Sequence, residues 1–364
     1  MSTSARSRGS RVERPRTDRY AAMDGYRGLF VLLVIAYHFG ATGLVGGWVG
    51  INHFFVFSGF LIARILIKER QRTGRIDVRR FYVRRARRVL PAMFVLVAAV
   101  LTHTAFLEQP AQQKQFGGDA LATLGFYLNW RLIGRSNSYF DQIGNPSPLR
   151  HAWTLSVEEQ FYVVIPFLIL AICALTRSRR LRFTLVMALA CLSTWWTAHL
   201  GLASFEDQAR LYYGTDTRAF ELLIGAAAGA WIGPSQWGHA RPAPWLLWLE
   251  RLAWPALFAL VIAMLTFDES SSGLFRGGLV AFCVVALVPI LAAASPHPNS
   301  FQHVLSFEWL RRLGLISYAL YLWHWPLHVY LAPERLGLDA AWAGVVQAVA
   351  ALVLATATYR FVEQ

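Results

Sequence analysis

The chain contains eleven apolar stretches that are candidates for membrane-spanning helices. They lie near 26–43, 49–67, 89–107, 117–133, 157–175, 183–200, 217–233, 252–267, 275–294, 313–331 and 340–358. A helix needs about 17–25 mostly apolar residues to cross the hydrocarbon core of a bilayer. The composition agrees, because 55% of the residues are hydrophobic, 15% are charged and the mean hydropathy is +0.39. The sequence therefore predicts an all-α polytopic membrane protein.

The formal net charge is +14, which in a soluble protein would suggest a nucleic-acid partner. The long apolar stretches are incompatible with that class and with a disordered chain, so we expect the lipid bilayer as the partner and no nucleic acid. The three cysteines, Cys173, Cys191 and Cys283, lie far apart within apolar stretches. We therefore expect neither a disulfide framework nor a metal site.

The positions of the arginines predict the topology, because cytoplasmic loops carry the excess of basic residues. Residues 1–20, 64–88 and 177–182 are rich in arginine. All three fall on the cytoplasmic side when the weak 117–133 stretch is re-entrant or interfacial. We therefore predict about ten transmembrane helices with both termini in the cytoplasm. Residues 1–20 would form a disordered basic tail, and 21–364 a transmembrane domain in the plasma (inner) membrane.

The first predicted span carries two ionisable residues on one face. Arg27 lies near the cytoplasmic end and His38 lies eleven residues further along. Eleven residues turn a helix by about 1100°, so both side chains point the same way, about 16 Å apart along the axis. Ionisable residues inside a membrane are costly and usually functional, so this face predicts a polar path. The alternative is that Arg27 snorkels and His38 only bonds a neighbouring helix.

A basic block at 81–91 leads directly into the third predicted span and contains Arg84, Arg85 and Arg88. The forked guanidinium group matches phosphate oxygens in pairs, so the block is a candidate phosphate site. Arginines at such a position also enforce membrane orientation and bind anionic lipids. Their density alone does not separate these two roles.

Two further blocks place unusual side chains within predicted spans. Glu158 and Glu159 begin the 157–175 stretch, where the alternative is a first-turn position favoured by the helix dipole. His324 lies between two tryptophans, the first of which is Trp323. An aromatic belt at the membrane interface explains tryptophans, but it does not explain a histidine between them.

Six blocks, in order, resemble the acyltransferase-3 family of integral-membrane O-acyltransferases, which includes O-antigen and peptidoglycan O-acetylases and macrolide acyltransferases. The resemblance covers the chain from about residue 20 to its end, and six ordered blocks are far more specific than any one of them. The matching residues are Asp24, Arg27, His38, Gly47, Gly50, Phe54, Phe55, Ser58, Gly59, Phe60, Phe81, Arg84, Arg85, Arg88, Pro91, Leu155, Ser156, Glu158, Gln160, Phe161, Ser317, Tyr318, Tyr321, Trp323, His324, Pro326 and 359–363.

The chain departs from the family pattern at three positions. Asn52 stands where an acidic residue is usual, Thr154 stands where serine is usual, and Glu221 replaces the commoner aspartate that follows Arg218. These departures leave the expected fold unchanged. The chain ends directly after the closing block, so we expect it to lack the extracytoplasmic esterase-like domain that some relatives carry.

The resemblance implies an enzyme that moves an acyl group, acetyl or another short one, from acyl-CoA to a hydroxyl of a carbohydrate or glycosylated acceptor, without a metal. Acetyl-CoA is the favoured donor. The expected phosphate ligands are Arg84, Arg85 and Arg88, and Arg27 would orient the donor. His38 would act as general base, because an imidazole pKa of ~6.5 suits proton transfer near neutrality.

The remaining candidates surround this base. Glu158 would orient His38 or bind the sugar, and Asp24 would belong to the catalytic group through its place in the first block. The expected substrate contacts are Glu159, His324, Trp323 and Ser58. We favour direct transfer over an acyl-histidine intermediate.

A second interpretation is a transporter or flippase of envelope precursors that moves protons or an anionic solute. Inverted repeats with interrupted helices would favour it, and none is visible in the sequence. A non-catalytic lipid sensor would leave the pairing of Arg27 with His38 unexplained. Slow hydrolysis of an acyl-CoA by the purified protein would separate the enzyme from both alternatives.

Overall fold

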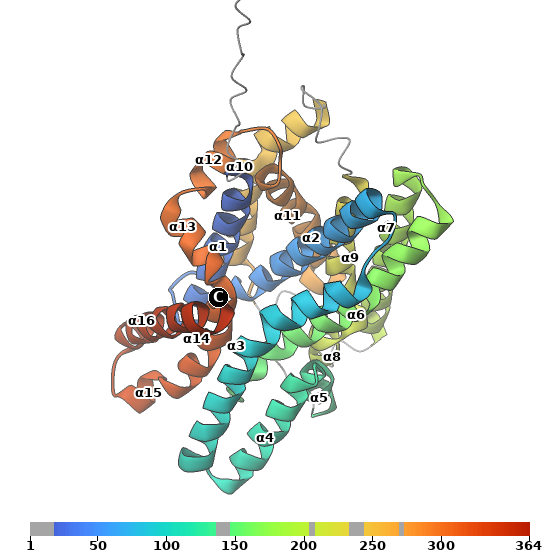
Figure 1. Ribbon diagram of the computed structural model, residues 1–364. Helices are drawn as coiled ribbons and strands as arrows, with labels where there is room; N and C mark the ends of the chain where they lie inside the picture. The colour runs from blue at the N-terminus through green and yellow to red at the C-terminus, as the bar shows by residue number, and fades with distance from the viewer. Residues whose placement is uncertain (1–17, 136–145, 204–207, 233–243, 269–272) are drawn as a thin grey trace, which may run out of the picture.

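The computed structural model describes residues 18–135, 146–203, 208–232, 244–268 and 273–364, and every regular element in these ranges is helical (Figure 1). The longer helices are α1 (Asp18–His38), α2 (Gly50–Thr73), α3 (Val78–Leu107), α4 (Pro110–Leu124), α6 (Trp153–Leu175), α7 (Arg179–Ala203), α9 (Thr215–Trp231), α10 (Pro244–Thr266), α11 (Leu279–Ala293), α14 (Ser317–Tyr330) and α16 (Ala340–Thr358). Most of the predicted basic tail, 1–17, lies outside the described residues.

Shorter helical elements connect these helices. They are η1 (Gly47–Val49), α5 (Leu128–Gly134), η2 (Arg150–Ala152), α8 (Gln208–Tyr213), η4 (Leu274–Gly278), α12 (Ser300–Leu305), α13 (Glu308–Leu315), α15 (Pro333–Leu336) and η5 (Tyr359–Glu363).

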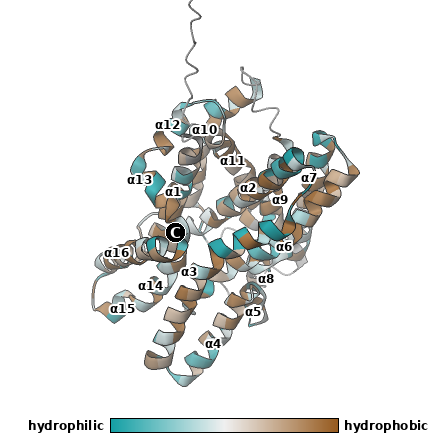
Figure 2. Ribbon diagram, in the orientation of Figure 1, coloured by the Kyte–Doolittle hydropathy of each residue, from teal (hydrophilic) through white to brown (hydrophobic). Residues whose placement is uncertain are grey.

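Within the described ranges, seven helices are long and apolar enough to cross a membrane. They span Gly47–Thr73, Val78–Leu107, Arg150–Leu175, Arg179–Gly201, Pro244–Thr266, Arg276–Ala293 and Ala340–Glu363. Apolar residues colour much of the long helices, and hydrophilic residues gather on α13 and at the beginning of α3 (Figure 2). The predicted all-α polytopic membrane fold is confirmed. The count of ten spans and the cytoplasmic termini stay predictions.

Two of the predicted spans are interrupted. Near 117–133, α4 ends at Leu124 and α5 begins at Leu128, and between them Phe126 adopts a φ of +54°. The 15 residues of α4 give only about 22 Å of helix, so this stretch does not cross the membrane as one helix, in agreement with a re-entrant or interfacial segment. The 313–331 stretch divides at Ile316 into α13 and α14, so the helix that carries His324 begins only at Ser317.

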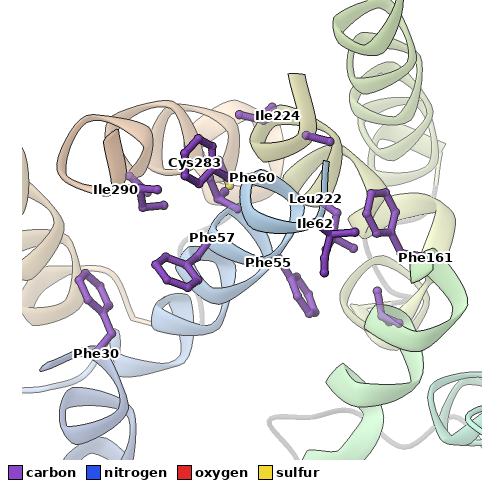
Figure 3. Close-up of a cluster of buried hydrophobic side chains, with 14 of the residues drawn as sticks. Phe30, Phe55, Phe57, Phe60, Ile62, Phe161, Leu222, Ile224, Cys283 and Ile290 are labelled. Carbon is purple, nitrogen blue, oxygen red and sulfur yellow. The ribbon is translucent and has the colours of Figure 1, made fainter. Parts of the chain in front are cut away.

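The most extensive helix pair joins α2 to α9 through glycines. A Cβ atom at Gly59 would lie 1.9 Å from the carbonyl oxygen of Leu222, and one at Gly225 would lie 2.0 Å from that of Val56. Small residues let membrane helices approach until their backbones touch. Around this contact, Phe57 and Phe60 of α2 meet side chains of α9 and α11 in the apolar core (Figure 3).

A similar contact holds α1 against α13. A Cβ atom at Gly314 would lie 1.8 Å from the Asp24 carbonyl oxygen, and one at Gly28 would lie 2.4 Å from the Leu310 oxygen. The glycines of the first sequence block therefore have a packing role. They bring the chain segment before α14 against α1, beside Arg27.

Gly225→Ala is expected to lower the thermal unfolding temperature of the purified protein, because the added methyl group forces α2 and α9 apart. Overpacking of this kind typically costs about 1–3 kcal/mol. The matched control is Gly117→Ala in α4, where nothing lies within 4 Å of the Cβ position and alanine favours a helix by about 0.5–1 kcal/mol. Thermal unfolding in detergent measures both. Equal unfolding temperatures for Gly225→Ala and the wild type would contradict the close contact.

Candidate active site

A cavity of about 360 Å³ lies among α1, α2, α3, α6 and α14. Six of the residues that the sequence selected line it: Arg27, Ser58, Arg84, Arg85, Arg88 and Glu158. The rest of the lining is mainly apolar and aromatic, and much of it comes from α2. The cavity thus joins a cationic wall to a long apolar wall.

Arg27 is held in place by two polar side chains. Its Nη2 atom lies 2.6 Å from Ser317 Oγ on α14, and its Nη1 atom lies 3.4 Å from the Asp24 carboxylate. Asp24 does not itself line the cavity. Its carboxylate and the Ser317 hydroxyl fix the direction in which the guanidinium faces.

The basic block and the two glutamates meet at the same wall. Arg85 Nη2 donates to Glu159 Oε1 at 3.2 Å, and its guanidinium carbon lies 3.9 Å from the centre of the Tyr162 ring. Tyr162 also hydrogen-bonds Ser58, and Glu158 interacts with both of these hydroxyl groups. Glu158 therefore contacts residues of the arginine-lined cavity, and it is not among the residues that surround His38.

A second, smaller space of about 20 Å³ lies beside His38 and is bordered by three histidines, His38, His151 and His324. The ring centres of His38 and His324 are 5.0 Å apart, and those of His151 and His324 are 5.4 Å apart. We call this space the histidine chamber. Among the residues that the structure describes, no His, Cys, Asp and Glu side chains form a group that could hold a metal ion.

Hydrogen bonds set the tautomers of two of these rings. Nδ1 of His38 lies 2.9 Å from the carbonyl oxygen of Val34, and Nδ1 of His324 lies 2.6 Å from that of Tyr321. A carbonyl oxygen only accepts, so each Nδ1 carries a hydrogen, and Nε2 of each neutral ring is an acceptor. Both rings can therefore take up a proton at Nε2, which is what a general base must do.

The cavity and the histidine chamber are neighbours, because Ile51, Thr154 and Tyr321 line both. These three residues and His151 were not selected as site residues from the sequence. One signal was available, since Tyr321 lies three residues before His324 and so shares its helical face. His151 lies on the three-residue element η2, which is too short to show a helical period.

Trp323 is not brought together with the other candidates. Its indole Nε1 donates to Thr358 Oγ1 at 2.8 Å, which links α14 to α16, and it lines neither the cavity nor the chamber. Glu159 also lies outside both linings, although it pairs with Arg85.

The unusual residues Asn52 and Glu221 share one partner. Arg218 Nη2 donates to Asn52 Oδ1 at 2.6 Å, and its Nε atom lies 3.1 Å from Glu221 Oε1. All three residues are buried, with at most 1% of each exposed. One carboxylate therefore balances one guanidinium, and the neutral Asn52 supplies an acceptor without adding a second buried charge.

Comparison with known proteins places this arrangement in a family. Residues 20–360 match the acyltransferase-3 family model, which is described as an acyltransferase domain. The chain is 34% identical over 356 residues to peptidoglycan O-acetyltransferase OatA of Listeria monocytogenes, covering 96% of this chain and 56% of that protein. It is 31% identical over 359 residues to O-acetyltransferase OatA of Staphylococcus aureus, covering 97% of this chain and 58% of that protein.

The chain thus spans little more than half the length of these relatives. No solved structure matched it significantly. The match over nearly the whole chain, together with the six ordered blocks, shows that the chain belongs to the acyltransferase-3 family.

Proposed function

We propose that the chain transfers an acetyl group from acetyl-CoA to a hydroxyl of peptidoglycan, within the plasma membrane. The observation that carries this proposal is the shared border between an arginine-lined cavity and a chamber of histidines. The names of both relatives support the acetyl group, and the name of the Listeria monocytogenes relative supports the peptidoglycan acceptor. In this proposal, residues 21–364 form the acyltransferase domain.

The two walls of the cavity suit two parts of an acyl-CoA, its phosphate groups and its pantetheine arm. Arg84, Arg85 and Arg88 present guanidinium groups that can bind phosphate oxygens by charge-assisted hydrogen bonds. The apolar wall that continues from them along α2 suits the uncharged pantetheine arm. Arg27 lines the same cavity, and its bonds to Asp24 and Ser317 fix the direction of its guanidinium group.

We assign the proton transfer to His38. Its Nε2 atom accepts the proton of the acceptor hydroxyl while the hydroxyl oxygen attacks the thioester carbonyl carbon. The carbon–sulfur bond then breaks, its electron pair goes to sulfur, and the proton passes to the departing CoA thiolate. His324 is the second acceptor in the chamber and is proposed to contact the acceptor hydroxyl.

The two glutamates are assigned to the donor side. Glu158 interacts with Ser58 and Tyr162, and Glu159 with Arg85, so both hold the cationic wall in shape. This assignment replaces the idea that Glu158 orients His38. Trp323 is proposed to keep α14 in register through Thr358.

A transporter or flippase is not favoured. That interpretation rested on intramembrane arginine, histidine and glutamate alone, and membership of an acyltransferase family accounts for these residues through a group transfer.

His38→Ala is expected to lower acetyl transfer by about 10²–10⁴-fold, the usual range for losing a general base. The measurement is transfer of radiolabelled acetyl from acetyl-CoA to a peptidoglycan fragment, with the protein in lipid nanodiscs. His303→Ala, an exposed histidine on α12, is the control and should retain wild-type activity. Full activity of His38→Ala would remove His38 from the mechanism.

Arg88→Gln is expected to raise the KM for acetyl-CoA roughly tenfold, because one charge-assisted hydrogen bond is worth about 1.5 kcal/mol. Arg87→Gln is the matched control, since Arg87 is also exposed on α3 but does not line the cavity. Steady-state kinetics at varied acetyl-CoA distinguish the two. A KM that rises equally in both variants would assign the arginines to a general surface effect.

A further inference from the structure

The wall between the cavity and the histidine chamber is built from three helices. Ile51 comes from α2, Thr154 from α6 and Tyr321 from α14, and these residues line both spaces. A group that moves directly from the arginine-lined cavity toward His38 meets these three residues. Its dimensions therefore bear on which donors can react.

Hydrogen bonds hold the wall in one position. The Tyr321 hydroxyl donates to the carbonyl oxygen of His151, so the bond between Tyr321 and Thr154 must use the hydrogen of Thr154. The Tyr321 ring also lies against two imidazoles, with its centre 5.2 Å from that of His151 and 5.4 Å from that of His324. Thr154 is 5% exposed and, being β-branched, has few alternative rotamers.

The space beyond the wall is small. The cavity measures about 360 Å³ and the chamber about 20 Å³. By this measure a single water molecule needs about 10–15 Å³, so the free space of the chamber fits about one such group, and an acyl chain that enters it competes for that space with the acceptor hydroxyl. A methyl group is comparable to a water molecule, whereas each further methylene needs space that the chamber does not offer.

The acyl group is the leading end of the donor. The CoA phosphates bind at the arginines, so the thioester sulfur arrives from the cavity side and the acyl chain points ahead into the chamber. When the acceptor oxygen bonds to the carbonyl carbon and the carbon–sulfur bond breaks, the acyl chain must already fit beside His38. An acetyl group places one methyl there, and a butyryl group places three carbons.

We infer that Ile51, Thr154 and Tyr321 set the acyl length that this protein accepts, admitting acetyl and excluding butyryl. This inference rests on the proposed function and adds to it the residues that determine donor specificity. One surplus methylene in a closed pocket typically reduces the specificity constant by about 10–200-fold.

The test compares kcat/KM for acetyl-, propionyl- and butyryl-CoA, with the full chain in nanodiscs and CoA release followed by chromatography. Ile51→Ala removes three carbons from the wall and is expected to raise the butyryl-to-acetyl ratio at least tenfold. Leu61→Ala is the matched control, since Leu61 is also a half-buried residue of α2 but lines only the larger cavity. It should leave the ratio unchanged, whatever its effect on KM.

Thr154→Ser keeps the hydroxyl and removes one methyl group, so it tests the wall even where Ile51→Ala fails to fold. It is expected to raise the propionyl-to-acetyl ratio. Wild-type protein that uses butyryl-CoA as well as acetyl-CoA would overturn the inference, as would equal shifts for Ile51→Ala and Leu61→Ala. In both cases the proposed acetyl transfer would stand. Failure to use any acyl-CoA would instead overturn the proposed function, and the length limit with it.

Discussion

The register between α1 and α14 determines the geometry of the whole site. Arg27 of α1 bonds Ser317, and further along both helices His38 lies against His324. The two helices therefore run in the same direction, with a cation at one level and a pair of imidazoles at the next. Close backbone contact at Gly28 and at the segment just before α14 makes this register possible. The cavity and the histidine chamber form where α2, α3 and α6 complete the enclosure.

The charged groups in the helical core are of two kinds. Arg218 is enclosed and is matched by Asn52 and Glu221, so it serves the packing of α2 against α9. Arg27 and Arg85 each have a carboxylate partner but also face the cavity. A carboxylate partner lowers the free-energy cost of burying a guanidinium group in a membrane protein. The guanidinium atoms that face the cavity remain as hydrogen-bond donors for an anionic ligand.

Much of the fold was predictable because membrane spans carry a strong compositional signal, and the helical face shared by Arg27 and His38 follows from helix geometry alone. The arginines of α3 were selected because their block leads directly into a span, and three of them line the cavity. The wall of Ile51, Thr154 and Tyr321 was not predicted, because its three residues come from distant segments and no local pattern shows that they meet. The placement of Glu158 away from His38 likewise depends on how α6 packs, and the break at Ile316 depends on contacts of Gly314 with α1.

The hydrogen-bonded wall also bears on how such a protein keeps a membrane sealed. In the orientation predicted from the sequence, the arginine block of α3 lies on the cytoplasmic side. Thr154 and Tyr321 keep the arginine-lined cavity and the histidine chamber as two separate spaces. The hydrogen bonds that hold these two residues therefore limit how far water can extend from the cavity toward His38.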